Sequence, residues 1–238
     1  RLVSPQIIQS FASPSAKVIY VGKQCRKGAS TPQATINELM VLYACDGKLV
    51  VRLKGGDVSI FSNILDELET LSQHNIPYEI VPGVTAALGA AAYAGMPLTA
   101  RSYSTAVRFL TAYKSDIVSE SYWKELAQTD DTLVFYMSSE TLENVVQQLT
   151  AHQIAADKLL AVVEQATTPY QQVYTSSLYE YCEKLGGKKF LSPTLVIIGK
   201  VVALHAQFRW LQSKNETAEY FRSETITVNE NEQLALTA

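Results

Sequence analysis

One stretch of the sequence, residues 49–61, constrains the fold more than any other. It starts as a run of apolar, strand-forming residues, breaks at Gly55 and Gly56, ends on Asp57 and opens into a helical pattern over residues 64–73. A buried strand, a glycine turn and a helix form the unit with which an open α/β sheet places a ligand at the carboxyl ends of its strands. Paired glycines let a ligand approach the backbone because no Cβ stands in the way. The alternative is a plain strand-to-helix turn in which Asp57 caps the helix.

A second glycine turn follows the next predicted strand. An apolar run leads into Pro82 and Gly83, and a helix of small residues then ends at Gly95. Strands of this half are expected at 17–21, 49–54 and 76–81, and helices at 6–11, 33–45, 64–73 and 86–94. Because strands and helices alternate, we expect a parallel sheet with right-handed crossovers and both glycine turns along one edge of it.

The second half of the chain repeats strand and helix patterns in a less regular order. Strands are expected at 107–111, 132–137, 159–164, 171–175 and 194–198, and helices at 123–128, 140–152, 178–185 and 201–211. Because this order does not strictly alternate, we expect a mixed sheet. The sequence thus predicts two α/β domains, over 1–98 and 99–212, and a polar, flexible tail over 213–238.

Composition and charge limit the classes of function. Hydrophobic residues make up 47% of the chain and charged residues 18%, which is typical of a globular protein. The net charge of -3 gives no general attraction to nucleic acid or membrane, so an anionic ligand needs a local cluster of Arg and Lys. The three widely spaced cysteines favour reduced thiols of a cytoplasmic protein over disulfides or a zinc site. Apolar stretches fall short of the ~20 residues of a membrane helix.

A series of motifs runs in order through nearly the whole chain. They are Arg-Leu-Val-Ser-Pro at 1–5, Ile-Tyr-Val-Gly-Lys at 19–23, Val-Val-Arg-Leu-Lys-Gly-Gly-Asp at 50–57, Val-Pro-Gly-Val-Thr-Ala-Ala at 81–87, Ala-Tyr-Ala-Gly-Met-Pro-Leu-Thr at 92–99, Thr-Leu-Val-Phe-Tyr-Met at 132–137 and Thr-Thr-Pro at 167–169. In order and spacing they resemble the tetrapyrrole (corrin/porphyrin) methylase family, and within it most closely the branch that methylates uroporphyrinogen III.

The resemblance implies a fold, a cofactor and a reaction. The fold is two α/β domains with a cofactor cleft between them, and the cofactor is S-adenosylmethionine, which leaves as S-adenosylhomocysteine. The reaction is C-methylation of uroporphyrinogen III at C-2 and C-7, which gives precorrin-2 for sirohaem and cobalamin synthesis. The enzyme is expected to act as a homodimer on this small-molecule tetrapyrrole, without nucleic acid, membrane or metal.

The resemblance also assigns roles to single residues. It implies that the cofactor is held by Gly55, Gly56, Asp57, Ile60, Thr85, Ala86, Met137 and Ala166. Lys23 matches the family lysine to which proton donation is assigned. Candidates for the carboxylates of the macrocycle are Arg26, Arg101 and Arg108, because arginine binds carboxylates through two parallel hydrogen bonds.

Several departures from the family pattern bear on the substrate. The glycine-rich first strand and the general-base aspartate, which would immediately precede Arg1, are absent from the sequence as given. Val58, Ser59 and Ser62 stand at divergent positions, and Asn63 replaces the family arginine thought to meet the substrate. Ala166 stands where the family usually has glycine. These changes leave the cofactor assignment in place and open the choice of acceptor.

Each assignment has a structural alternative. Lys23 is otherwise a solvated residue after a strand, Met137 a core residue, and Thr85 the start of a packed helix. The arginines are otherwise surface charges, and Asp66, Glu67 and Glu69 are read as a solvated helix face. Rival functions are methylation of another precorrin and a non-catalytic binding protein of the same fold. A nicotinamide enzyme is disfavoured because no Gly-x-Gly-x-x-Gly follows a strand.

Overall fold

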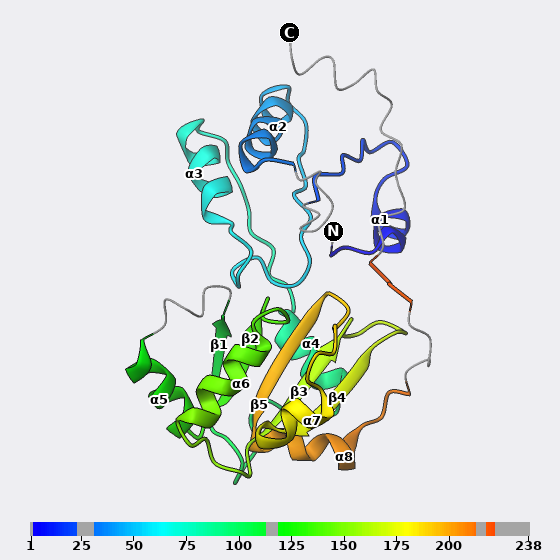
Figure 1. Ribbon diagram of the computed structural model, residues 1–238. Helices are drawn as coiled ribbons and strands as arrows, with labels where there is room; N and C mark the ends of the chain where they lie inside the picture. Colours follow the sequence, from blue (N-terminus) through cyan, green and yellow to red (C-terminus); the bar gives the residue numbers. More distant parts are fainter. Residues whose placement is uncertain (1, 23–30, 113–118, 213–217, 222–238) are drawn as a thin grey trace. The chain divides into compact units, whose positions relative to one another are not determined.

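The chain folds into two compact units, and the second carries the β-sheet. The computed structural model describes residues 2–22, 31–112, 119–212 and 218–221 (Figure 1). The first unit holds the chain up to Pro82 together with Phe221, and the second is Gly83–Tyr220. All structural statements that follow concern the described residues.

Three helices form the regular structure of the first unit. They are α1 (Pro5–Phe11), α2 (Gln33–Cys45) and α3 (Leu65–Gln73). Helix α1 starts with proline, and the Ser4 hydroxyl accepts the N–H of Gln6 as its cap. Helices α2 and α3 pack together, and Asn37 of α2 joins them because its Nδ2 donates to Thr70 Oγ1 at 2.8 Å.

The parallel sheet predicted for this half is absent from the described residues of the first unit. Residues 17–21, 49–54 and 76–81 are irregular there, and their apolar side chains reach the surface: Leu49 is 93% exposed and Val51 74%. An apolar run specifies a strand only when neighbouring strands complete its hydrogen bonds and another layer covers its face. Neither condition is met at these residues, so the prediction of strands there from the local sequence pattern is wrong.

The second unit is built on a five-stranded mixed sheet. Its strands are β1 (Val107–Thr111), β2 (Thr132–Tyr136), β3 (Leu159–Glu164), β4 (Gln172–Ser177) and β5 (Thr194–Gly199). Their order is β1-β2-β5-β3-β4, with β1 parallel to β2 and the other three pairings antiparallel. The mixed α/β class and the positions of all five strands are therefore confirmed.

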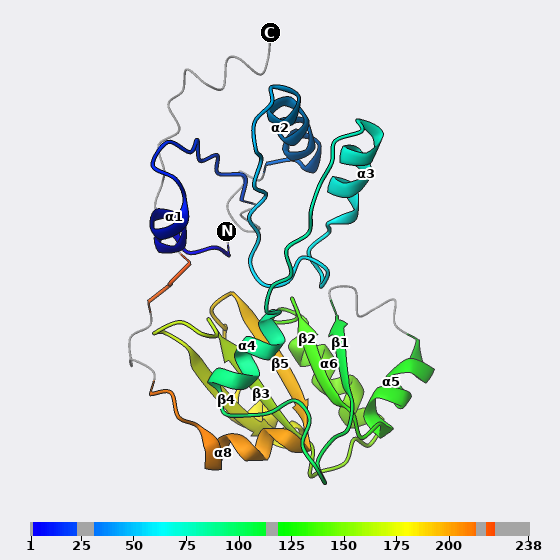
Figure 2. The same cartoon turned by 180° about the vertical axis from the view of Figure 1, so that it is seen from behind.

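Helices cover both faces of this sheet. They are α4 (Ala86–Tyr93), α5 (Glu120–Gln128), α6 (Leu142–Ala151), α7 (Tyr181–Lys184) and α8 (His205–Phe208), with 3₁₀ turns η2 (Leu178–Glu180) and η3 (Lys200–Leu204) before the last two. Helix α6 lies over one face in Figure 1, and α4 lies over the other face in Figure 2. The two helices predicted at 178–185 and 201–211 are thus each a 3₁₀ turn followed by one α-helical turn.

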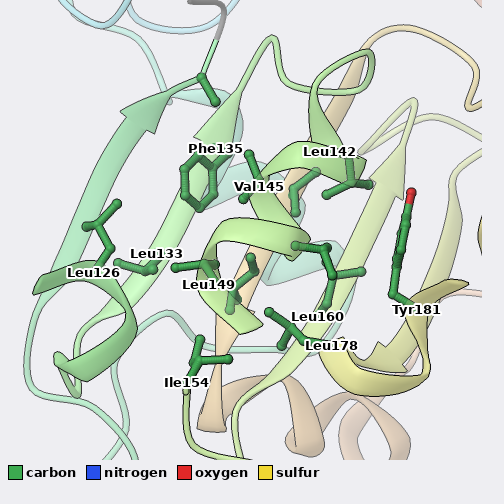
Figure 3. Packing of buried hydrophobic residues seen from close by; sticks show 14 of the residues in the cluster. Leu126, Leu133, Phe135, Leu142, Val145, Leu149, Ile154, Leu160, Leu178 and Tyr181 are labelled. Carbon is green, nitrogen blue, oxygen red and sulfur yellow. The ribbon is translucent and has the colours of Figure 1, made fainter. Parts of the chain in front are cut away.

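The core of the second unit follows the two-residue alternation of its strands. On β2, Leu133 and Phe135 face one hydrophobic cluster, and Val134 between them faces the other. The first cluster contains Leu126, Val145, Leu149 and Tyr181, which lie around Phe135 and Leu160 in Figure 3. The second holds the small residues of α4, whose methyl side chains let that helix lie close to the sheet.

Three strands end at one edge of the sheet, which we call the carboxyl edge. Strands β2 and β3 are both antiparallel to β5, and β1 is parallel to β2, so β1, β2 and β3 run in the same direction. Their last residues, Thr111, Tyr136 and Glu164, share this edge, and β5 begins there at Thr194. Loops that follow parallel strand ends are where α/β sheets bind ligands.

Candidate functional site

The first turn of α4 is fastened to the carboxyl edge by one hydroxyl. Tyr136 Oη lies 2.7 Å from Thr85 Oγ1 and accepts the backbone N–H of Ala87 at 3.0 Å. Thr85 is the N-cap residue of α4, yet its own side chain makes no capping bond. Because the first N–H groups of a helix lack partners within the helix, Tyr136 supplies a cap from a strand about fifty positions away in sequence.

Met137 leaves the end of β2 in an unusual conformation. Its φ is 54°, in the left-handed region, and its side chain is 56% exposed. A residue other than glycine rarely adopts this conformation unless the surrounding structure holds it there, and such residues cluster at ligand sites. The core alternative for Met137 is therefore wrong: the side chain is presented at the carboxyl edge rather than packed beneath it.

The turn after β3 contains Ala166, with two further left-handed residues beside it. Gln165 has a φ of 46° and Thr167 a φ of 68°. The turn is held by the N–H of Thr167, which donates to Oε1 of the buried Gln171 at 2.8 Å. Helix α4 packs closely against the same turn. A Cβ added at Gly89 of this helix would lie only 3.1 Å from Thr167 Cγ2.

The second unit therefore brings four predicted cofactor residues to one edge. Thr85 and Ala86 start α4, Met137 follows β2, and Ala166 follows β3. Thr85 is buried, whereas Ala86 is exposed and carries only a methyl group, so a ligand can reach the start of α4 at Ala86.

The glycine turn at residues 55–57 lies in the first unit and has its own geometry. Gly56 has a φ of 77°, which a glycine adopts without strain. A Cβ at Gly55 would lie 2.7 Å from the carbonyl oxygen of Leu2, so the chain itself fills the side on which a Cβ would stand, while Gly55 is otherwise exposed. Asp57 does not cap α3, whose N-cap is Ile64; instead its Oδ1 accepts the N–H of Ser59 at 2.8 Å.

The remaining predicted residue of this turn is Ile60. Its N–H donates to the carbonyl of Asp57 at 3.3 Å, and the residue is half-buried. The turn that carries Asp57 is thus closed by its own backbone, and the isoleucine is only partly open to solvent.

A buried acid behind this turn was missed from the sequence. Glu67 is only 3% exposed; its Oε1 accepts Arg52 Nε at 3.0 Å and its Oε2 accepts Lys54 Nζ at 2.9 Å. The solvated-face interpretation of Glu67 is therefore wrong. A signal was present, because Arg52 and Lys54 are two residues apart and so project to the same side of an extended chain.

Opposing effects act on the charge of Glu67. Burial by itself raises the pKa of this carboxyl group, but the hydrogen bond from Lys54 and the positive charges of Arg52 and Lys54 outweigh burial. The pKa of Glu67 consequently lies below its ordinary value, and the group is an anion at neutral pH.

The predicted substrate arginines of the second unit lie away from the carboxyl edge. Arg108 is near the start of β1, where its Nε binds Asp131 Oδ2 and its terminal nitrogen binds Glu125 Oε1, both at 2.5 Å. Hydrogen bonds to Glu125 and Asp131 hold the pKa of Arg108 above its ordinary value. Arg101 is exposed in the turn that the Ala100–Ser104 bridge closes before β1 begins. Neither arginine joins the cluster around Thr85.

Two predicted residues, Lys23 and Arg26, lie outside the described residues. Within the described part of the chain, no group of three or more His, Cys, Asp or Glu side chains is arranged to hold a metal ion. The helices seen there are all too short or too polar to cross a bilayer.

Known proteins resemble this chain over most of its length. Siroheme synthase of Vesicomyosocius okutanii is 42% identical over 90% of this chain and 46% of its own length, and that of Nitrosomonas europaea is 43% identical over 91% and 45%. The chain thus spans about half the length of these relatives. A crystal structure of uroporphyrin-III C-methyl transferase from Thermus thermophilus, complexed with S-adenyl homocysteine, matches with a TM-score of 0.62 and 29% identity, covering 78% of each chain.

Most of the chain also matches the sequence model of one protein family. The sequence model of the Tetrapyrrole (Corrin/Porphyrin) Methylases fits residues 2–182, which include the glycine turn, α4 and the strand ends at Met137 and Ala166. The chain therefore belongs to the tetrapyrrole (corrin/porphyrin) methylases.

Proposed function

We propose that this chain is an S-adenosylmethionine-dependent methyltransferase that C-methylates uroporphyrinogen III at C-2 and C-7 to give precorrin-2. The observation that carries the proposal is the carboxyl edge of the second unit. There the first turn of α4, fixed by Tyr136, and the exposed left-handed Met137 lie together. The likeness to a uroporphyrin-III C-methyl transferase seen with S-adenyl homocysteine supports this choice of cofactor and acceptor.

The residues fit the chemistry of the cofactor. The sulfonium of S-adenosylmethionine supplies a methyl group that is already activated for transfer. The carboxylate of Asp57 is suited to accept hydrogen bonds from ribose hydroxyls, and the thioether of Met137 is a soft, adaptable contact. In this proposal Gly55, Gly56 and Ile60 complete the contacts on the first unit, and Thr85, Ala86 and Ala166 complete those on the second.

The protein's own task is to align the donor with a carbon acceptor and to manage one proton. Alignment alone is able to contribute about 7–11 kcal/mol in favourable cases. We assign the proton to Lys23, whose amine is a suitable general acid or base, and contact with substrate carboxylates to Arg26. The proposal leaves out Arg101 and Arg108, since both lie away from the carboxyl edge and Arg108 is held by two carboxylates.

The proposal includes a homodimer in the cytoplasm. Cys45 and Cys182 support a reducing compartment, since both are free thiols at the surface. Sedimentation of the purified protein measures the oligomeric state, and a monomer at the concentration used in the activity assay would contradict this part of the proposal.

Calorimetry and a methyl-transfer assay test the function together. We expect S-adenosylhomocysteine to bind with one site per chain, and uroporphyrinogen III to accept two methyl groups, detected by mass. Met137→Ala should weaken binding, whereas Lys184→Met, which removes an exposed ion pair between α7 and Glu180 of η2, should not. A wild-type protein that binds no S-adenosylhomocysteine would show the proposed function to be wrong.

A second candidate acceptor has its own support. Asn63 stands where the family arginine is expected, has a φ of 55°, and donates from Nδ2 to Asp66 Oδ2 at 2.7 Å. It therefore supplies no positive charge to an anionic substrate. This departure from the family pattern motivates a different precorrin as the acceptor. Parallel assays with uroporphyrinogen III and a later precorrin decide between the acceptors.

A further inference from the structure

We propose that Lys54 and Glu67 are positioning residues that hold the glycine loop, defined here as residues 55–62, in the conformation that binds the cofactor. This inference rests on the proposed function for the identity of the ligand. The observation behind it is a single ammonium group that joins both ends of the loop to one buried acid.

Lys54 closes the loop through two hydrogen bonds of its side chain. It immediately precedes Gly55, and its Nζ donates to the carbonyl of Ser62 at 2.8 Å, which ties the start of the loop to its end. The same Nζ donates to Glu67 Oε2 at 2.9 Å, which ties both ends to α3. The loop in between carries Phe61 at a φ of 50°, a conformation that a residue other than glycine keeps only with support from the surrounding structure.

Burial makes this contact stronger than a surface ion pair. The side chain of Glu67 is 4% exposed and that of Lys54 13%, so little water screens their attraction. Gln33 of α2 also donates to Glu67 Oε1, at 3.4 Å, and anchors the acid from a second helix. The carboxylate therefore lies at a fixed point against which Lys54 holds the loop.

A comparison of Lys54 with Arg52 distinguishes positioning of the loop from a general contribution to stability. Arg52 binds the other oxygen of Glu67 at 3.0 Å, and its hydrogen bonds go to Glu67 and Leu53 rather than to Ser62. Removing Lys54 leaves the buried carboxylate of Glu67 paired with Arg52. The loop, however, loses the hydrogen bond between Lys54 and Ser62 that joins its two ends. Removing Arg52 takes the same charge away and leaves the loop closed.

The functional consequence is a change in the population of the binding-competent loop. If the loop spends a tenth of its time in that conformation, the apparent Kd rises about tenfold, because binding first has to select it. The bonds made by the bound ligand are unaltered, so the change falls on Kd and KM and leaves kcat close to that of the wild type.

The experiment compares Lys54→Met, Lys54→Arg and Arg52→Met in the full chain. Hydrogen exchange of residues 55–62 is measured without ligand, and Kd for S-adenosylhomocysteine by calorimetry. We expect Lys54→Met to expose the loop amides and to raise Kd about tenfold, Lys54→Arg to restore much of both, and Arg52→Met to change neither. Ile36→Val, a core change in α2 of the same unit, controls for a general loss of stability.

The outcomes separate this inference from the function on which it rests. Equal loop exchange in Lys54→Met and the wild type would overturn the positioning role, whether or not S-adenosylhomocysteine binds. Equal weakening of binding by Lys54→Met, Arg52→Met and Ile36→Val would also overturn it, since the effect would then be global. A wild type that binds no S-adenosylhomocysteine refutes the proposed function, and the loop exchange then decides the positioning role alone.

Discussion

Removing one oxygen atom, by Tyr136→Phe, tests whether a strand residue caps α4. The hydroxyl makes two hydrogen bonds, to the buried Thr85 side chain at 2.7 Å and to the N–H of Ala87 at 3.0 Å. A hydrogen bond within a protein contributes about 0.5–1.5 kcal/mol, so two together amount to about 1–3 kcal/mol. The ring remains and keeps its edge-on contact with Phe109, with centroids 6.0 Å apart, so packing is preserved.

Urea unfolding followed by circular dichroism measures the loss of stability in Tyr136→Phe. Tyr122→Phe removes a hydroxyl from a side chain that is 37% exposed on α5, and this control should unfold like the wild type. Thr85→Val completes a double-mutant cycle, and the two losses should sum to more than the loss in the double mutant because they share a bond.

The binding arm of the same experiment tests the link to function. Tyr136→Phe should raise the Kd for S-adenosylhomocysteine, since the first turn of α4 is freed from the carboxyl edge. The reasoning is refuted if Tyr136→Phe unfolds at the same urea concentration as the wild type, because the hydroxyl would then contribute nothing to the start of α4.

Two further predictions follow from the ionised groups. Because the folded pKa of Glu67 lies below 4.5, this carboxylate contributes stability that is complete above that pH and lost as the pH falls through the folded pKa. Acid titrations of unfolding should therefore show a shallower loss in Glu67→Gln than in the wild type, and parallel curves would contradict the assignment. Arg108→Met should lower the unfolding temperature, because Glu125 and Asp131 lose their partner, and leave the Kd for S-adenosylhomocysteine unchanged. If calorimetry showed a higher Kd for this variant, Arg108 would belong to the cofactor site after all.

Local sequence patterns predicted much of the second unit and its position in the family. The strand expected at 159–164 is observed as β3, Leu159–Glu164, and all five residues after Leu159 are almost fully buried. Such a strand packs on both faces, so a continuous apolar run is enough to identify it. Helix α2 likewise matches its expected bounds of 33–45. The order of the short motifs identified the family because each motif lies at a turn or strand end. The backbone conformation there restricts which residues can occur.

Contacts between distant residues decided the rest. The first-unit strands failed because a strand is stabilised by partners elsewhere in the chain, and the exposed Leu49 and Val51 have no covering layer. The sequence by itself determined which segments are apolar, where the chain turns, and which residues carry charge. Only the tertiary structure decided that Glu67 is buried beside Lys54 and that Tyr136 caps a helix about fifty residues earlier. The physical reason is that hydrogen bonds and ion pairs depend on separation in space, which local sequence does not specify.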